Sequence, residues 1–220
     1  MSKYVVIDLE MCKVAKEQRK TFHAAHEIIQ IGAVLLDDAL NVSRRFNCYV
    51  RPEYGRIDPF IENLTGISQE QVDNAPMLSE SLAAFFCWLP DEDVTAVSWS
   101  MTDKAQFSKE LAEKDIQMEQ MDRLLSGWID CQKTFAQKTG VTRPYSLADA
   151  LNATDIMDEG RAHDGLADAY NTALLFAKME REDELVLNPY FAVAFRESKE
   201  PTLGFSLGDL LNGLNLQATT

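Results

Sequence analysis

The chain has 220 residues, of which 46% are hydrophobic and 25% are charged, as in an ordinary globular protein. Its formal net charge of −14 argues against a tight, non-specific binder of long duplex nucleic acid, which needs a basic face. The charge favours substrates that are short or single-stranded and held at one end. No apolar run reaches the ~18 residues of a membrane span, and no signal-peptide pattern is present, so we expect a cytoplasmic protein without membrane contact.

The four cysteines are far apart in the sequence and form no CxxC pair. This spacing predicts reduced thiols rather than disulfides or a zinc knuckle.

Strand patterns come first along the chain. The short, β-branched run 4–9 is typical of a central strand, and runs 28–36 and 46–50 are also strand-like. A turn signal, Asp37-Asp38, separates the second run from the third, and Pro52 ends the third. These three runs predict an antiparallel meander.

Helix signals dominate the remainder. Asp58-Pro59 marks a helix start, Gly66 ends that helix, and Ser68 with Gln71 forms a capping box. The later elements are predicted in this order: a helix that ends at Pro90, a strand over 94–98, a helix over 102–114, a fifth strand near 128–131, a helix that ends at Gly140, a short helix capped by Ser146, and a long helix over 165–180.

This order predicts an α/β domain. Its sheet would be mixed and five-stranded, an antiparallel meander extended by parallel strands and flanked by helices. We expect the domain to cover residues 1–180. Residues 181–220 are expected to form a C-terminal extension docked on the domain or on a second subunit, which leaves a homodimer open.

Asp8 and Glu10 stand two residues apart where the first predicted strand ends, so their side chains share one face. The residues before them are apolar on both faces, which predicts a buried strand. Two carboxylates there would repel each other, and a divalent metal held by oxygen ligands would offset the repulsion. The alternative is a solvated strand end, where acids cost little.

Three further residues are candidates for the same site. Asp103 follows the fourth strand, at the edge where α/β sheets bind ligands, although Ser100 three residues earlier also suits a simple helix cap. His163 and Asp168 would diverge by about 140° on one continuous helix. The turn signal Asp164-Gly165 instead places His163 in a loop and Asp168 in the first turns of a helix. The alternative is an exposed loop histidine and an ordinary acid near a helix start.

Taken together, these residues resemble the DEDD superfamily of 3′–5′ exonucleases, in its histidine subclass (DEDDh), which has an RNase H-like fold. The three matching motifs are Asp8-Leu9-Glu10, residues 99–103, and His163 with Asp168. Segments 64–67 and 72–76 also resemble the branch that acts on RNA 3′ ends, which includes enzymes trimming small RNAs and histone messages and the bacterial KapD-like proteins. The chain departs from the pattern at Met11, Cys12 and Ser100, which bears on substrate choice.

The resemblance implies a metal-dependent exonuclease that hydrolyses the 3′ ends of single-stranded nucleic acid, RNA favoured over DNA, to nucleoside 5′-monophosphates. It implies that two Mg²⁺ or Mn²⁺ ions bind Asp8, Glu10, Asp103 and Asp168, and that His163 is the general base. Two rival interpretations are a non-catalytic nucleic-acid-binding relative and a phosphoesterase acting on small nucleotides.

Substrate contacts are predicted after the first motif. The polar stretch there has a local surplus of three positive charges, from Lys13, Lys16, Arg19 and Lys20 against Glu17. We expect it to contact substrate phosphates, with a solvated mobile loop as the alternative. Family placement adds Met11 and Leu64 as contacts to the terminal base.

Overall fold

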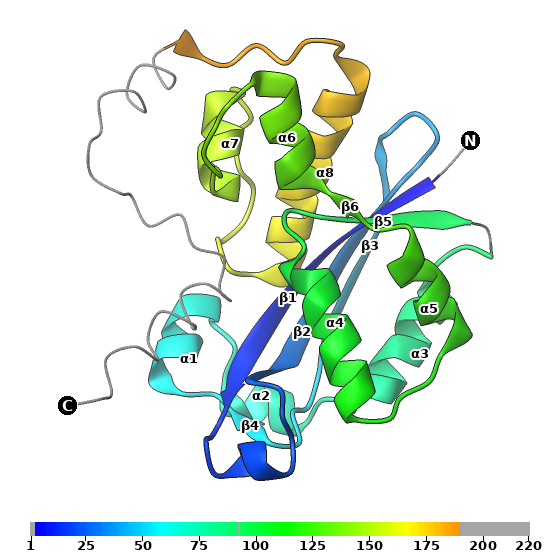
Figure 1. The fold of residues 1–220 in the computed structure, drawn as a ribbon, viewed down its shortest axis with the longest axis vertical. Coiled ribbons are helices and arrows are strands. Elements are labelled where there is room, and N and C mark those ends of the chain that lie inside the picture. Colours follow the sequence, from blue (N-terminus) through cyan, green and yellow to red (C-terminus); the bar gives the residue numbers. More distant parts are fainter. Residues whose placement is uncertain (1–2, 92, 190–220) are drawn as a thin grey trace.

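The structure, a computed structural model, describes residues 3–91 and 93–189 and shows a twisted mixed sheet between two groups of helices (Figure 1). The sheet has six strands in the order β3-β2-β1-β5-β6, and β4 pairs with β1 outside this path. The strands are β1 (Lys3–Val14), β2 (His26–Leu36), β3 (Val42–Tyr49), β4 (Gly55–Arg56), β5 (Val94–Ser98) and β6 (Ile129–Asp130). The five predicted strands are confirmed, and the prediction of only five is corrected by β4. Two residues are too few to leave a recognisable strand pattern.

The predicted arrangement of the strands is also confirmed. β1, β2 and β3 form the antiparallel meander, and β5 and β6 extend it in parallel. We predicted that Asp8 and Glu10 end the first strand, and this was wrong, because β1 continues to Val14. Near Asp8 it is the pairing of β1 with its parallel neighbour that ends, because β5 pairs with β1 only as far as Val6.

The helices have the caps that the sequence predicted. Asp58 accepts a hydrogen bond from the N–H of Ile61, Gly66 ends the same helix at φ 76°, and Ser146 accepts from the N–H of Asp149. The helices are α1 (Pro59–Thr65), α2 (Gln69–Asp73), α3 (Leu78–Trp88), α4 (Thr102–Glu113), α5 (Glu119–Ser126), α6 (Cys131–Thr139), α7 (Leu147–Ala153) and α8 (Gly165–Arg181), with a 3-10 turn η1 (Gln18–Lys20). The sequence did not predict α5, whose eight residues bury only Met121 and Leu124.

The side chains of β1 alternate between two hydrophobic cores. Val5, Ile7 and Leu9 pack with residues of α3, α4 and α5. Val6 packs on the other face, with residues of α6, α7 and α8. Each fully buried aliphatic or aromatic side chain contributes about 1.5–3 kcal/mol. β1 is therefore fixed from both faces, and any group that it carries has a defined position.

The chain after α8 begins by packing on the domain. Leu185 is buried in the second core, and the N–H of Asn188 donates to the carbonyl of Ala153 at 2.7 Å. Residues 190–220 lie outside the described residues, so a docked extension over 181–220 stays a prediction. Within 3–91 and 93–189, no helix combines the length and hydropathy that crossing a bilayer requires. All four cysteines are unpaired, as predicted.

Candidate active site

The side chains of Asp8 and Glu10 leave β1 on the same face as Val6, which is the face that packs against α8. Asp8 lies opposite Gly32 on β2. A Cβ atom on Gly32 would come within 2.0 Å of the carbonyl carbon of Gly165, so glycine is needed there for the start of α8 to lie against the sheet. This close approach brings the first turn of α8, which carries Asp168, to the two carboxylates of β1.

Asp103 reaches the same strand from α4. Because β5 has ended, the N–H of Leu9 has no strand partner, and it donates to Asp103 Oδ1 at 3.1 Å. The carboxylate is buried, with 6% of the residue exposed, and it binds the backbone between Asp8 and Glu10. Ser100 does not form the capping box that the alternative required, because its hydroxyl contacts Thr102 instead. Asp103 is therefore part of the acidic cluster.

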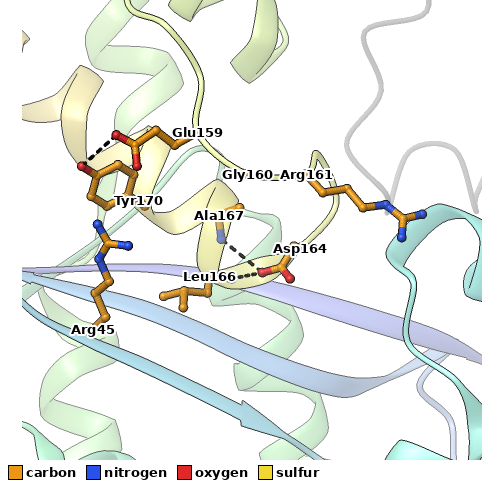
Figure 2. A pocket seen from close by; sticks show the side chains of 8 residues that line it. All are labelled: Arg45, Glu159, Gly160, Arg161, Asp164, Leu166, Ala167 and Tyr170. Atoms are coloured by element: carbon orange, nitrogen blue, oxygen red, sulfur yellow. Dashed lines mark hydrogen bonds between the residues drawn. The ribbon is translucent and has the colours of Figure 1, made fainter.

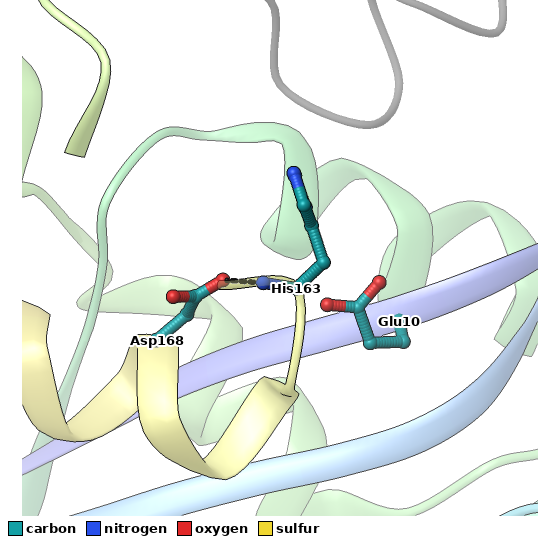
Figure 3. A group of neighbouring side chains, drawn as sticks. All are labelled: Glu10, His163 and Asp168. Carbon is teal, nitrogen blue, oxygen red and sulfur yellow. Dashed lines mark hydrogen bonds between the residues drawn. The ribbon is translucent and has the colours of Figure 1, made fainter. Parts of the chain in front are cut away.

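The loop before α8 holds His163 as predicted. His163 has φ 62°, a left-handed backbone, and its N–H donates to Asp168 Oδ2 at 2.9 Å. Asp164 caps α8 by accepting from the N–H groups of Leu166 and Ala167. Ligand atoms of Glu10, His163 and Asp168 lie within 4.8 Å of one another, and Figure 3 shows Glu10 and Asp168 on either side of the histidine. The turn thus brings His163 and Asp168, five residues apart, to the same site.

A buried amide fixes the start of α8. Gln30, 1% exposed, accepts from the N–H of Gly165 at 3.0 Å and donates to Asn47 Oδ1 at 2.9 Å. An uncharged acceptor satisfies the helix N–H without adding a charge to the acids nearby. The sequence analysis missed Gln30, although a lone polar residue inside an apolar strand was a signal.

Hydrogen bonds from Arg161 hold the loop that carries His163 to α1. The guanidinium of Arg161 donates to the carbonyl oxygens of Asn63 and Leu64 at the end of that helix. Figure 2 shows Arg161 directed to α1, away from the remainder of a pocket on the outer side of the loop. That pocket, about 290 Å³, is lined by Arg45, Glu159, Gly160, Arg161, Asp164, Leu166, Ala167 and Tyr170. The loop that carries His163 is thus anchored at α1 as well as at α8.

The acids strongly perturb one another. Burial, and then the charges of Asp103 and Asp168, raise the pKa of Asp8 well above its usual range. Burial, and then Asp168 and Asp103, do the same to the pKa of Glu10. Burial raises the pKa of Asp103 to about 7 and that of Asp168 to about 6. One oxygen of Glu10, Oε2, is buried without a hydrogen-bond partner among the described residues.

This donor set fits a divalent cation. Hard cations such as Mg²⁺ and Mn²⁺ prefer carboxylate oxygens. A cation would offset the mutual repulsion of the four acids and would give the unpartnered oxygen of Glu10 a ligand role.

We expect the metal-free protein to gain stability as pH falls from about 8.5 to about 6.5. The pKa of Asp103 is about 7 in the fold and lower in the unfolded chain, so the folded state binds more protons in this window. Unfolding free energy therefore decreases as pH rises. At the acid end of the window the histidines of the unfolded chain take up protons that His26, with a folded pKa of about 4, does not, which opposes the trend, so the slope is read above about pH 7.5. Thermal unfolding in a chelator measures the trend.

Asp103→Asn is the matched control for this trend. Asparagine keeps an oxygen for the N–H of Leu9 but does not titrate, so the variant should be the more stable protein at the alkaline end and should lose the part of the pH slope that Asp103 contributes. Mn²⁺ should stabilise the natural protein more at the alkaline end, where the acids are deprotonated. A metal-free stability that rises with pH over this window would contradict the assignment of a strained acidic cluster.

Comparison with known proteins identifies the family. The model of the exonuclease family RNase T matches residues 5–176, which include all five residues of the site. The chain belongs to this exonuclease family. The nuclease domain of 3′hExo, described as a DEDDh family member bound to rAMP, superposes on this chain with a TM-score of 0.70 at 25% identity, covering 85% of this chain and 96% of that one. The RNase H-like fold and the DEDDh resemblance are thereby confirmed.

Curated relatives of this chain are named exoribonucleases or 3′-5′ exonucleases. Mouse ERI1 exoribonuclease 2 is 31% identical over 181 residues, 73% of this chain but 26% of that protein. The chain spans only a quarter to a third of such relatives, with 32% for the zebrafish protein. The 3′-5′ exonuclease Snipper of Drosophila melanogaster is 27% identical over 84% of this chain and 74% of its own.

The residues predicted to contact substrate differ in how exposed they are. Met11 is 3% exposed and packs with Ile61 and Ile67, while Leu64 lies partly buried at the edge of the same cluster. Lys13 is half-buried on β1, and Lys16 is exposed beyond it. Their roles in binding stay predictions.

Proposed function

We propose that this protein is a metal-dependent 3′–5′ exonuclease that removes nucleotides from single-stranded nucleic acid, preferring RNA to DNA. The observation that carries the proposal is the convergence of Glu10, His163 and Asp168 within 4.8 Å, with the partly buried Asp8 and the buried Asp103 interacting electrostatically with them. Relatives named exoribonucleases support it. So do solved relatives described with rAMP and with a histone mRNA stem-loop.

Asp8, Glu10, Asp103 and Asp168 would hold the ions. When bound, two Mg²⁺ or Mn²⁺ ions supply positive charge that stabilises the attacking and leaving oxygens of an in-line displacement. The protein's part is to hold four carboxylates on rigid elements: two on β1, one on the first turn of α4 and one on the first turn of α8. Their raised pKa values mean that the metal-free site is fully charged only above neutral pH.

His163 would accept the proton of the attacking water. Burial, and then the charge of Arg161, lower the pKa of its imidazole, so the ring stays neutral and able to take a proton at neutral pH. The backbone N–H of His163 is bound to Asp168, which fixes the loop and leaves the ring free to face the water. Attack on the terminal phosphodiester would release a nucleoside 5′-monophosphate and leave the shortened strand with a 3′-hydroxyl.

The end of the substrate would lie between β1 and α1. Leu64 and Met11 are proposed contacts for the terminal base, and Lys13 and Lys16 for phosphates. The carbonyl of Leu64 binds Arg161, so a base seated against α1 would also be close to the histidine loop.

A single assay tests the function. The full chain is incubated with Mn²⁺ and 5′-labelled single strands of RNA and DNA of one sequence. We expect a ladder that shortens from the 3′ end, faster on RNA, which disappears in chelator. Cleavage of small nucleotide esters alone would indicate a phosphoesterase. Binding of the strand without any cleavage would indicate a non-catalytic relative.

A further inference from the structure

Three strands carry basic side chains in one row, beyond the acidic site. On β1, Lys13 is in register with His26 of β2 on one side and with Arg56 of β4 on the other. Directly opposed residues of antiparallel strands have Cβ atoms about 4.5–5.5 Å apart on one face, and like charges there repel. Lys13 and Arg56 therefore concentrate positive charge at one end of the sheet, with His26 beside them, in a chain whose net charge is −14.

Two other elements add to this charge. Arg19 of η1 donates to the carbonyl of Val14, next to Lys13, and α4, which carries Lys109, is bound to β2 by the Gln106 side chain donating to the carbonyl of His26. Burial and then the charges of Arg19, Lys13 and Lys109 lower the pKa of the His26 imidazole to about 4. We call Lys13, Arg19, Arg56 and Lys109 the basic row. Among the described residues, none of these four cations has a carboxylate within 4.0 Å.

The acids nearby have other partners. Glu113, one helical turn beyond Lys109, accepts hydrogen bonds from the N–H and the ring of His23, and these bonds, with a smaller contribution from the charge of Lys109, lower its pKa. Glu27 and Glu110 are fully buried and both pair with Lys114 at 2.9 Å. The cations of the basic row thus remain available to an external anion.

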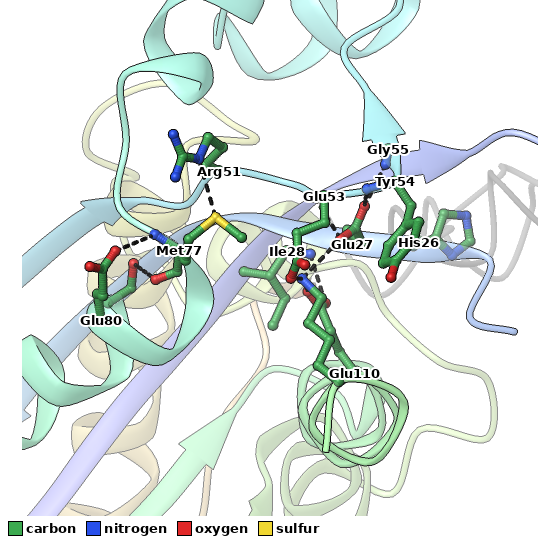
Figure 4. A network of polar contacts seen from close by, with 12 residues as sticks. His26, Glu27, Ile28, Arg51, Glu53, Tyr54, Gly55, Met77, Glu80 and Glu110 are labelled. Atoms are coloured by element: carbon green, nitrogen blue, oxygen red, sulfur yellow. Dashed lines mark hydrogen bonds and ion pairs between the residues drawn. The ribbon is translucent and has the colours of Figure 1, made fainter. Parts of the chain in front are cut away.

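A buried polar network holds the row in place (Figure 4). The carboxylate of Glu27 accepts the N–H groups of Glu53, Tyr54 and Gly55, which fixes β4 and Arg56 beside β1. Glu110 accepts the N–H of Ile28 at 2.8 Å, which fixes α4 and Lys109 against β2. The cations therefore project from positioned elements rather than from a free loop.

We propose that the basic row binds the phosphates of a single strand upstream of the nucleotide being removed. Lys13 stands three residues beyond Glu10 on the same strand, about 10 Å at 3.3 Å per residue. Side chains three residues apart on a strand leave opposite faces, so a nucleic-acid strand whose 3′ end reaches the acidic site would pass the edge of β1 over residues 7–12, which pairs with neither β5 nor β4. Beyond that edge its phosphates would meet cations that, among the described residues, have no carboxylate within 4.0 Å. The inference rests on the proposed function, and it adds Arg56 and Lys109 to the lysines that the sequence indicated.

The test compares two double variants of equal charge change. Arg56→Gln with Lys109→Gln removes two exposed cations of the basic row, and Arg123→Gln with Lys133→Gln removes two exposed cations from α5 and α6. The probes are oligouridylates of about 4 and about 20 nucleotides, since single-strand sites span about 4–16 nucleotides.

For the first variant, we expect KM on the long strand to rise about tenfold with kcat unchanged. The salt dependence of binding should fall by about 1.4 on a log–log scale, at about 0.7 per phosphate. Activity on the short strand should change by less than about twofold, as should every parameter of the second variant.

Fluorescence anisotropy of the long strand in chelator separates this proposal from the exonuclease proposal. A tenfold weaker Kd in the first variant alone would support the basic row even if no strand were cut. Unchanged long-strand affinity, or an equal loss in both variants, would overturn it, while cleavage of the short strand would leave the exonuclease proposal standing.

Discussion

Replacing Asp168 by asparagine should lower hydrolysis by at least about 10³-fold, because several kcal/mol of transition-state stabilisation depend on the ions that its charge helps to hold. The amide keeps an oxygen for the N–H of His163, so the loop should retain its position. The variant removes one of four mutually repelling acids, and its metal-free form should melt no lower than the natural protein. Steady-state kinetics with Mn²⁺ and thermal unfolding in chelator measure the two effects.

Asp158→Asn is the matched control. Asp158 lies exposed in the same loop and its charge contributes to the raised pKa of Asp168, but it is not part of the cluster with Glu10 and His163. Its loss should change activity by less than about twofold. Asp8→Asn should repeat the result for Asp168. Full activity in Asp168→Asn or in Asp8→Asn would refute the metal assignment.

Features that depend on neighbouring residues could be predicted from the sequence. The caps at Asp58, Gly66 and Ser146 are bonds between residues three or four apart, and their sequence patterns were sufficient. The turn that separates His163 from Asp168 is equally local. The motif residues were therefore placed correctly on strands, helices and loops before their distances were known.

Contacts between residues far apart in the sequence could not be predicted. Gln30 meets Gly165 across 135 positions, and Arg161 meets Asn63 across 98. No local pattern encodes such pairs.

The buried face of α8 shows the same limit. Leu166, Tyr170 and Leu174 recur at helical spacing on α8 but are only partly buried, whereas Ala169, Ala173 and Phe176 are fully buried. Small residues face the sheet because the helix lies so close to Gly32. The close approach that assembles the site thus also decides which side chains of α8 are buried.

His163→Ala should lower kcat by about 10² to 10⁴, the usual effect of removing a general base. Nothing in the loop requires the imidazole for its fold, because the backbone N–H makes the bond to Asp168. The Mn²⁺-induced rise in melting temperature should therefore persist, since the four carboxylates remain. His23→Ala is the control, because that ring is exposed and pairs only with Glu113 among the described residues.

The pH profile distinguishes a base from a positioning residue. Burial lowers the pKa of His163 below its ordinary value near 6.5, so the neutral ring persists into mildly acidic solution and is lost below that. Titration of the carboxylates affects the natural protein and the variant alike, so it cancels in the ratio of their kcat values. That ratio should be constant near neutral pH and shrink toward one as acid protonates the imidazole. A ratio independent of pH would mean that His163 acts without exchanging a proton, and that the water is activated by the ions alone.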